Sequence, residues 1–408
     1  MNIIKYFIII SSFSITHILP YAKEKAVICV PIADLVGQPL QKIYSTRTSN
    51  DSYDQLPVCW NYNPLYACPR LHQLLYNDVV DIITEEGDEV CIQINQLFYI
   101  TPTITTPQTT YWTAKKNICL LKDLPHTIDR KHIPEPIDFN NPQQHAHIIT
   151  LTQPHYDQTT QLTFSVGTRF VCVPHIKKTK TIKVFVVDYA HNKECRILIP
   201  TNKCIFLCNS NPNQQIKNFV DLLKSWSNSE NSFIPYVWGG TSFTTTQNTP
   251  FKTVTKKTNN QSFSYYEYEN DNTAYPKNGF DCSGLILRAA QICNMPYFYK
   301  NTTTIAQHLK PLQVHDVLIN GDLILVKGHV MIVSDINKNL LVEARSYDHG
   351  YGKIHEIALN KVFDSIETYA DLCAAFFNKK ELKRKDIQGV IRDTYKDWRI
   401  LKILSVYK

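Results

Sequence analysis

Cys282 stands where a helix is predicted to begin, which is a chemically useful place for a thiol. Behind it, apolar residues recur with helical spacing at Leu285, Ile286, Ala289 and Ala290. Backbone N–H groups and the positive end of the helix dipole stabilise a thiolate there and lower its pKa below about 8.5. The same N–H groups, including that of Cys282, can hold the oxyanion of an attacked carbonyl. Cys282 is therefore a candidate nucleophile, with Asp281 as the helix cap.

His329 is the matching candidate base, because it heads a predicted strand. Alternation places it on one face with Met331 and Val333. Residues 340–344 read as the return strand of a hairpin, and Glu343 lies an even number of positions from His329, so both can share a face. Taken alone, His329 would more simply be a buried structural histidine. A cysteine, a histidine and an orienting carboxylate together predict the chemistry of a cysteine peptidase.

Four short segments around these residues carry a family resemblance. In chain order they are Tyr236-Val237-Trp238-Gly239-Gly240, Asp281-Cys282-Ser283-Gly284, Gly321-Asp322-Leu323 and Gly328-His329-Val330. Their order and context resemble the motifs of NlpC/P60 papain-like cell-wall peptidases. The resemblance covers residues 236 to about 359, and the β-rich stretches before it are similar in arrangement to bacterial SH3-like (SH3b) modules.

The resemblance implies a hydrolase of peptidoglycan stem peptides, L-Ala-γ-D-Glu-diamino acid, that cuts after γ-D-glutamate. Cys282 would attack the carbonyl, His329 would carry the proton and Glu343 would orient the imidazole. Residues matching Tyr236, Asp281 and Ser283 would bind the substrate, including its free amine, since an aspartate suits a cation. Packing is the alternative role for Tyr236.

Three features depart from the family pattern. The third catalytic position, usually His, Asn or another polar residue, is Glu343, which can still accept the ring N–H. Lys300 stands where many members have an arginine before a Thr pair, and lysine cannot make the same bidentate contact. The stretch 241–279, read as a long surface loop, is far longer than usual.

The expected fold is multidomain: an α+β papain-like catalytic domain preceded by two small all-β SH3-like barrels. We expect a signal peptide over 1–22, barrels over 23–122 and 161–208 joined by a proline-rich linker over 123–160, the catalytic domain over 209–378, and a basic tail over 379–408. A helix opened by Asn211 and Pro212 begins the catalytic domain.

The amino-terminal residues predict export to the periplasm or cell envelope. Residues 1–22 have the layout of a secretory signal peptide, and their apolar run is too short for a stable membrane span of roughly 20 residues. Export would permit disulfides among the 12 cysteines, in a pairing that spacing does not define. We expect no cofactor and no metal ion, since no Cys-x2-Cys spacing occurs.

The net charge of +7 is concentrated in the tail, where ten Lys and Arg residues face four Asp and Glu. A body-wide basic surface for nucleic acid is therefore not indicated. The apolar residues of the tail, Trp398, Ile400, Ile403, Leu404 and Val406, are enough to dock it on the domain. Its cations are expected to form a solvated face, with contact to anionic polymers or lipid headgroups as the alternative.

Two other functions stay open at the level of sequence. One is a cell-wall-binding protein whose papain-like domain has lost activity, for which the unusual Glu343 is the only support. The other is an exported amidase or acyltransferase that acts on a substrate other than the wall.

Overall fold

The structure is a computed structural model of the chain. It describes residues 23–43, 53, 56, 68–94, 97–101, 106–138, 147–174, 180–206, 211–228, 232–246, 252–258, 261–267, 278–347 and 350–407. The expected signal peptide over 1–22 lies outside these residues. None of the helices within the described ranges is long and apolar enough to cross a membrane. The described cysteines are free thiols, and Cys59 and Cys208 lie outside the described residues.

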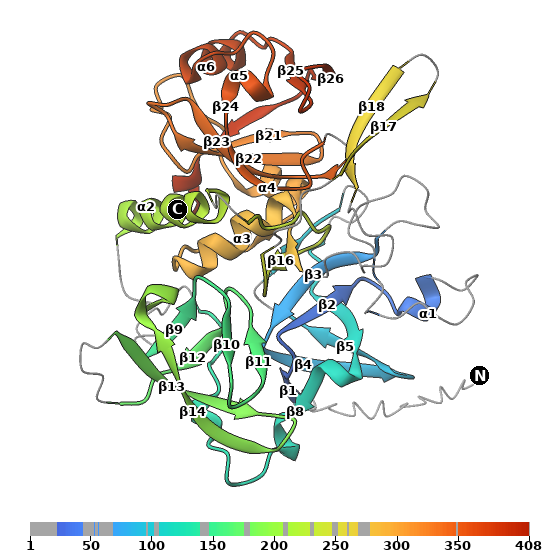
Figure 1. Ribbon diagram of the computed structural model, residues 1–408, viewed down its shortest axis with the longest axis vertical. Helices are drawn as coiled ribbons and strands as arrows, with labels where there is room; N and C mark the ends of the chain where they lie inside the picture. Colours follow the sequence, from blue (N-terminus) through green and yellow to red (C-terminus); the bar gives the residue numbers. More distant parts are fainter. Residues whose placement is uncertain are drawn as a thin grey trace, which may run out of the picture.

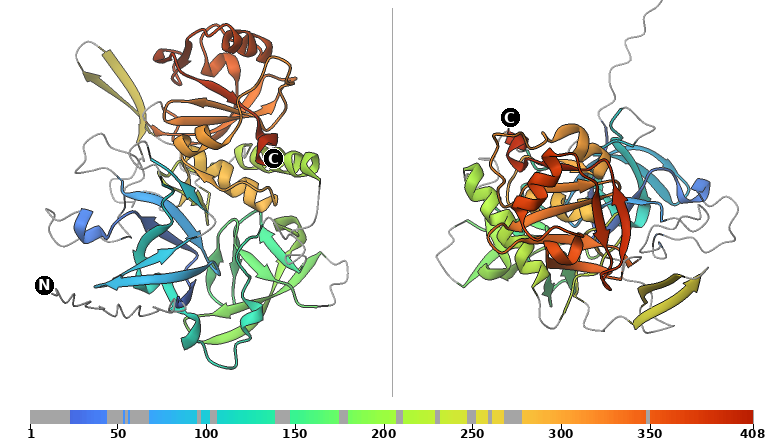
Figure 2. Two further views of the ribbon diagram at one scale, coloured as in Figure 1. Left: turned by 180° about the vertical axis from the view of Figure 1, so that it is seen from behind. Right: turned by 90° about the horizontal axis from the view of Figure 1, so that it is seen from above.

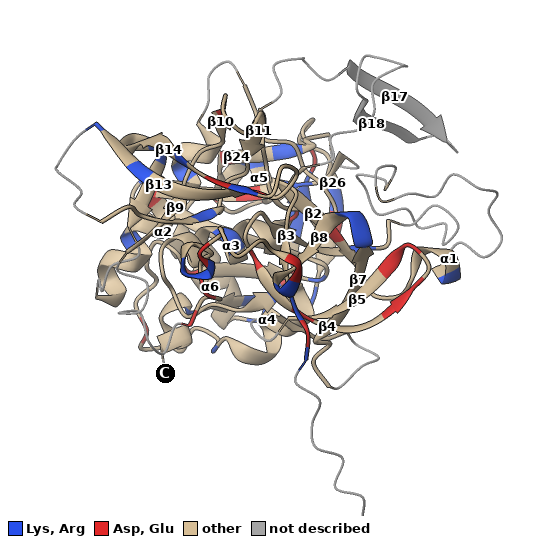
Figure 3. Cartoon of the chain, turned by 90° about the horizontal axis from the view of Figure 1, so that it is seen from below, with Lys and Arg blue, Asp and Glu red and all other residues tan. Residues whose placement is uncertain are grey.

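The first β unit is one antiparallel sheet of seven strands in the order β3-β2-β7-β5-β4-β1-β8. Its strands are β1 (Lys25–Ile28), β2 (Ile32–Val36), β3 (Arg70–Leu75), β4 (Val79–Glu86), β5 (Glu89–Gln93), β7 (Thr110–Ala114) and β8 (Ile118–Leu120), with the short helix α1 (Leu40–Ile43) after β2. The β-rich runs expected near residues 26–30, 79–83 and 90–94 are the strands β1, β4 and β5. Acidic residues gather at the tip of the β4–β5 hairpin (Figure 3).

The second β unit begins earlier in the chain than the sequence favoured. Its strands are β9 (Ile148–Leu151), β10 (His155–Asp157), β11 (Leu162–Phe164), β12 (Arg169–Val171), β13 (Thr181–Asp188), β14 (Lys193–Pro200) and β15 (Cys204–Phe206). Strands β9 and β10 therefore lie within 123–160, where an extended linker was expected. The whole of β9 is buried and pairs with β12 and β15, which outweighs the prolines around it.

The unit for which the sequence predicts a catalytic role, called the catalytic unit below, is built on a five-stranded antiparallel sheet in the order β24-β23-β22-β21-β27. The strands are β21 (Leu323–Val326), β22 (His329–Asp335), β23 (Leu340–Arg345), β24 (Lys353–Ala358) and β27 (Arg399–Leu401). Alternate side chains enter two different cores: Val330, Ile332 and Val342 face α2 (Pro212–Ser227) and α3 (Cys282–Ile292), whereas Met331 and Leu341 face α5 (Leu359–Val362) and α6 (Tyr369–Phe377). The predicted hairpin through residues 337–339 is present.

Helix α3 lies at the centre of the molecule, between this sheet and the two β units (Figures 1 and 2). Nearly every residue along it is buried, which is the pattern of a helix surrounded by protein. Helix α2 begins with Asn211 as its N-cap and Pro212 at its first position, as the sequence predicted.

The long stretch 241–279 is more ordered than the surface loop that we expected. It contains β16 (Thr241–Ser242), β19 (Gly279–Phe280) and a hairpin of β17 (Lys252–Thr258) with β18 (Gln261–Glu267). Figure 1 shows this hairpin projecting beside the five-stranded sheet. Residues 247–251, 259–260 and 268–277 lie outside the described residues.

The tail docks on the catalytic unit through its apolar residues, as the sequence predicted. Strand β27 extends the sheet along β21, and Trp398, Ile400 and Ile403 are buried. A hairpin of β25 (Leu382–Lys385) and β26 (Ile391–Tyr395) precedes β27 and lies near α5 and α6 (Figure 1). The tail is thus part of the fold of this unit.

Both edges of the five-stranded sheet are covered by short segments that contain proline. Beside β24, Pro235 bridges to Lys353, and the N–H of Ile354 donates to the carbonyl of Ile234 at 3.0 Å. Beside β27, Pro311 bridges to Leu401. Two exposed edges are thereby closed without a further long strand.

Candidate active site

Cys282 is the first residue of α3, as the apolar spacing predicted. Asp281 caps the helix, and its Oδ1 accepts a hydrogen bond from the N–H of Gly284 at 2.5 Å. Strand β19 leads directly into this helix. It lies so close to residue 235 that a side chain on Gly279 would meet the Pro235 carbonyl oxygen at 2.2 Å, so the position requires glycine. The N–H of Cys282 donates to no group within the described part of the chain. It is therefore available to an oxyanion.

The thiol of Cys282 differs from the activated thiolate that a helix start predicts. Burial, followed by the nearby carboxylate of Asp281, raises its pKa to about 12, and hydrogen bonding by the N–H groups of Val330 and Ser283 together with the charge of Lys300 opposes this only in part. The expectation of a lowered pKa is therefore wrong for this state of the molecule. Burial outweighs the helix terminus.

The strand that carries His329 begins beside Cys282. The N–H of Val330 reaches the sulfur of Cys282, and His329 is the residue before Val330. Gly328 lines the same small cavity as Cys282. No hydrogen bond joins the Cys282 thiol to the His329 ring among the described residues. Such bonds between catalytic groups are often long before a substrate binds.

His329 is held by Glu343, the carboxylate proposed from sequence. The pairing of Ile332 with Val342 places residue 329 diagonally across from residue 343 on one face of the sheet. The Nε2 atom of His329 lies 2.7 Å from Oε2 of Glu343. A carboxylate only accepts, so Nε2 carries the proton and the lone pair of Nδ1 is free to take another.

The charge state of His329 suits a base. Burial and the positive charge of Arg384 lower its pKa to about 4, against the opposing effect of Glu343. The imidazole is therefore neutral at neutral pH. A neutral imidazole can act as general base toward a neutral thiol that comes within its reach when a carbonyl arrives.

Glu343 has more partners than the sequence indicated. His355 on β24 lies 3.0 Å from Oε1, Arg345 lies 3.8 Å from the same oxygen, and Nη2 of Arg384 on β25 donates to Oε2. Burial favours the protonated acid, but Arg384 and Arg345 hold the pKa of Glu343 well below its usual range. Glu343 is a fully buried anion surrounded by four side chains, those of His329, His355, Arg345 and Arg384.

Three of these partners were missed, and the reasons differ. His355 is directly opposite Glu343 in the β23–β24 pairing, so a strand prediction over residues 353–358 could have found it. Arg345 lies two positions after Glu343 and shares its face by alternation. Arg384 follows no pattern that spacing could reveal, because it lies 41 positions away along the chain in a separate hairpin.

The proposed substrate-binding residues Asp281 and Lys300 are joined to each other. Lys300 on β20 (Tyr299–Lys300) is buried, and its Nζ lies 2.6 Å from Oδ1 and 2.5 Å from Oδ2 of Asp281. The same carboxylate accepts hydrogen bonds from Oγ of Ser283 at 3.1 Å and from the N–H of Gly239 at 3.0 Å. Asp281 therefore already has a counter-cation.

The first β unit supplies one wall beside Cys282. A cavity of about 60 Å³ next to the thiol is lined by Arg70, Leu71 and Tyr99 of this unit, and by Tyr236, Ser283 and Lys300 of the catalytic unit. Strand β6 (Phe98–Tyr99) pairs in parallel with β20, which brings Tyr99 beside Lys300. The wall is thus held by backbone pairing between the two units.

Gly239 explains why the opening motif needs glycine. Its φ is +71°, and a side chain there would meet the carbonyl oxygen of Arg70 at 2.5 Å. Arg70 is buried, pairs with Asp34 at 2.8 Å, and donates from Nη1 to the carbonyl of Trp238 at 3.0 Å. The motif therefore locks the first β unit onto the catalytic unit.

Tyr236 packs inside the protein and also borders the cavity beside Cys282, and its part in substrate binding stays a prediction. Its ring is buried, packs edge-on against Tyr347 with the centroids 6.3 Å apart, and also lines the cavity beside Cys282. Its carbonyl accepts a hydrogen bond from the hydroxyl of Tyr347 at 3.1 Å.

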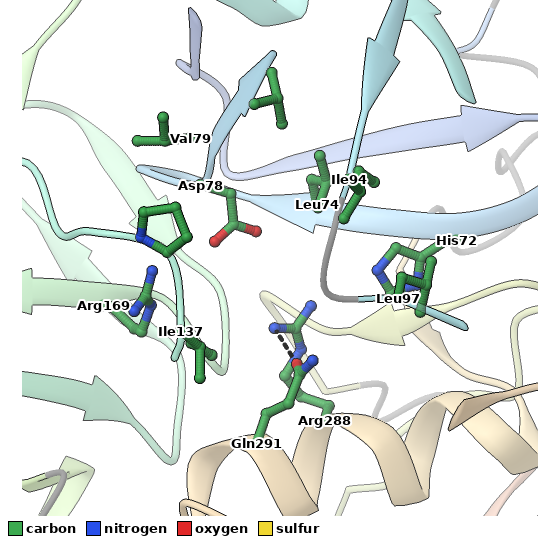
Figure 4. A pocket seen from close by; sticks show the side chains of 12 residues that line it. His72, Leu74, Asp78, Val79, Ile94, Leu97, Ile137, Arg169, Arg288 and Gln291 are labelled. Atoms are coloured by element: carbon green, nitrogen blue, oxygen red, sulfur yellow. Dashed lines mark hydrogen bonds between the residues drawn. The ribbon is translucent and has the colours of Figure 1, made fainter. Parts of the chain in front are cut away.

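A separate cavity of about 60 Å³ lies where α3 meets the two β units (Figure 4). Two buried guanidinium groups, those of Arg169 and Arg288, point into it. Arg288 donates to Gln291 at 3.1 Å, whereas Nη1 of Arg169 has no hydrogen-bond partner among the described residues. Neither Cys282 nor His329 lines this cavity, so it is not part of the candidate active site.

Comparison with known proteins found neither a matching family model nor a matching curated protein. Among solved structures, the chain is similar to an NlpC/P60 family protein from Bacillus cereus, with 15% identity and a TM-score of 0.48 over 82% of this chain and 94% of that one. It is also similar to NlpC2 from Trichomonas vaginalis, with 10% identity and a TM-score of 0.29 over 83% of this chain and 93% of that one. Similarity at this level describes those neighbours and assigns no family to the present chain.

Proposed function

We propose that the protein is an exported cysteine peptidase that hydrolyses peptidoglycan stem peptides at the bond between γ-D-glutamate and the diamino acid. One observation carries the chemistry: the buried thiol of Cys282, at the start of α3, meets the strand on which Glu343 holds the neutral ring of His329. The substrate class follows from the motif resemblance around Tyr236, Asp281 and His329. We further propose that the two β units are SH3-like modules.

In the proposed reaction, Nδ1 of His329 takes the proton of the Cys282 thiol as the sulfur attacks the γ-carbonyl carbon. The N–H of Cys282 stabilises the oxyanion. The C–N bond then breaks, and the leaving amine takes the proton from His329. A water molecule, deprotonated by His329, releases the acyl group from sulfur. Glu343 keeps the proton on Nε2 throughout.

The binding side of the cavity supports a compact amino-terminal residue such as L-alanine. Tyr236, Ser283 and the Asp281–Lys300 pair line the cavity together with the wall from the first β unit. A substrate amine would have to share Asp281 with Lys300, because that ion pair is already formed. We therefore expect a preference for the free amine that is weaker than an unpaired aspartate would give.

The test is mass spectrometry of L-Ala-γ-D-Glu-meso-diaminopimelate peptides, with free and with acetylated amines, after incubation with wild-type protein or Cys282→Ala. We expect cleavage after γ-D-glutamate by the wild type and none by Cys282→Ala, with unchanged far-UV circular dichroism. Cys373→Ala is the matched control, since Cys373 lies on α6 and away from the cavity. Residual turnover by Cys282→Ala would refute the nucleophile.

Absence of cleavage of either peptide by folded wild-type protein would overturn the peptidase. A pull-down on purified wall would then test the binding protein. Transfer of an acyl group to an added amine would instead favour the acyltransferase.

A further inference from the structure

We propose that Arg384, which lies in the tail hairpin, is a positioning residue for His329 that acts through Glu343. The idea rests on the proposed function, since it names a further residue of the same site. A tail expected from sequence to be a basic appendage would then be part of the catalytic machinery.

Geometry links Arg384 to the histidine through a single atom. Nη2 of Arg384 donates a hydrogen bond to Oε2 of Glu343. The same oxygen accepts the hydrogen bond from Nε2 of His329. Arg384 is 3% exposed and Glu343 is fully buried. A change at Arg384 therefore reaches His329 with one carboxylate oxygen between them.

The hairpin that carries Arg384 is itself anchored to the catalytic sheet. Nη2 of Arg345, two residues after Glu343, donates to the carbonyl of Lys385 at 2.8 Å. Arg384 bridges to Phe363 through the backbone, and the side chain of Leu382 enters the core under α5 and α6. Arg345 of the sheet thus binds the backbone of the hairpin, and Arg384 of the hairpin binds Glu343 of the sheet.

The charges around the cluster give Arg384 a second effect. Glu343 is one anion facing two guanidinium groups and two imidazoles, those of His329 and His355. Tyr351 and Tyr395 act on Arg345 by their charge, and Lys353 acts on His355. Asp386 and Asp393 act one step further out, on Tyr351 and Tyr395. Because the two arginines outnumber the carboxylate, protonation of either imidazole is disfavoured. Loss of one arginine removes much of that opposition.

The experiment compares Arg384→Gln and Arg384→Lys with Arg392→Gln. Arg392 lies on the partner strand β26 and pairs with Asp386 at 2.7 Å, so its loss alters the same hairpin without touching Glu343. For Arg384→Gln we expect kcat to fall about tenfold or more with little change in KM, because the imidazole is less well aligned. The acid limb of the kcat/KM profile should move up by about one pH unit.

Arg384→Lys keeps the charge and should keep the acid limb near its wild-type position while recovering part of kcat. Arg392→Gln should change neither. Wild-type kcat and an unmoved acid limb in folded Arg384→Gln would overturn the proposal. So would equal effects of Arg384→Gln and Arg392→Gln, because that result marks a role in hairpin stability alone.

Two readouts keep the inference separate from the identity of the substrate. The His329 resonance in an NMR titration should shift to a higher pKa in Arg384→Gln but not in Arg392→Gln. Alkylation of Cys282 by iodoacetamide should show the same difference in pH dependence. If the wild type cleaves no stem peptide and these differences remain, the proposed substrate is wrong and the positioning role stands; if the resonance does not move, the role of Arg384 is refuted. Should Arg384→Gln fail to fold, full kcat in Arg384→Lys would show that the guanidinium contact with Glu343 is not required, and would overturn the proposal.

Discussion

Two buried carboxylates lie near Cys282 and His329, and their surroundings differ in charge. Within the described part of the chain, Asp281 forms an ion pair with one cation, Lys300, and the pair is balanced. Glu343 has two arginines and two histidines around it, so cationic groups are in excess. A balanced pair can build a neutral wall for a substrate, whereas burial together with an excess of cations keeps neighbouring imidazoles unprotonated. Residue type alone does not separate these two roles; the number of counter-charges does.

The largest effect should follow from Glu343→Gln, which removes the anion that lies between the two arginines and the two histidines. His329 loses the acceptor that fixes its tautomer, and Arg345 and Arg384 lose their counter-charge. We expect kcat/KM for the stem peptide to fall about a thousandfold or more. Glu356→Gln, on the neighbouring strand β24, is the control and should retain activity. Retained activity in Glu343→Gln would show that the two carboxylates do not differ in the way proposed.

Lys300→Met should break the balanced pair and cost stability. Asp281 would remain buried without the cation with which it forms an ion pair, so the free energy of unfolding should fall by about 3 kcal/mol or more. The loss should exceed that of Arg384→Gln, because Glu343 retains Arg345. Urea denaturation of the two variants side by side measures the difference. Lys217→Met, which removes an exposed pair with Asp221, should change stability little.

Acid should weaken the folded state through the buried histidines. The pKa of His329 is lowered from 6.5 to about 4, so below pH 6.5 the unfolded chain takes up a proton that the folded chain refuses. Stability is therefore complete above pH 6.5 and declines as the pH falls toward 4. The difference of roughly 2.5 units corresponds to about 3 kcal/mol for this residue. Burial lowers the pKa values of His355 and His72 as well, which adds loss of the same sign.

Urea unfolding at pH 7, 5.5 and 4.5 measures this decline, and His329→Gln should make it shallower. An equal slope in both proteins would show that other groups cause the acid sensitivity. It would contradict the claim that the surroundings of Glu343 keep His329 unprotonated.

Local periodicity was sufficient to predict the helix start at Cys282 and the strand pair that carries His329 and Glu343. The helix that begins at Cys282 and the strand pair that joins His329 to Glu343 both follow from spacing of 3.6 and 2 residues, which short segments contain. Arg384 could not be predicted in this way, because its contact depends on how a distant hairpin packs. The high pKa of Cys282 was missed for a related reason: burial of that thiol depends on the first β unit and the histidine strand, far away in sequence.

Composition also misled in one place. Prolines over residues 123–160 favoured an extended linker, yet Ile148-Ile149-Thr150-Leu151 is a strand. Pairing with β12 and β15 and full burial decide its conformation, and these are tertiary effects that a proline count does not contain.

The covered edges of the five-stranded sheet bear on how the folded protein resists aggregation. An exposed strand edge can pair with a strand of another chain. Strands β21 to β24 are rich in apolar residues, which would stabilise the resulting aggregate. Here Pro235 and Pro311 lie over the two edges, and proline offers no backbone N–H to an incoming strand. Self-association through this sheet therefore requires residues 234–236 or 310–312 to detach first. The covering segment at β24 includes Tyr236 of the proposed binding site, so the residues that serve recognition also protect the native state from strand addition.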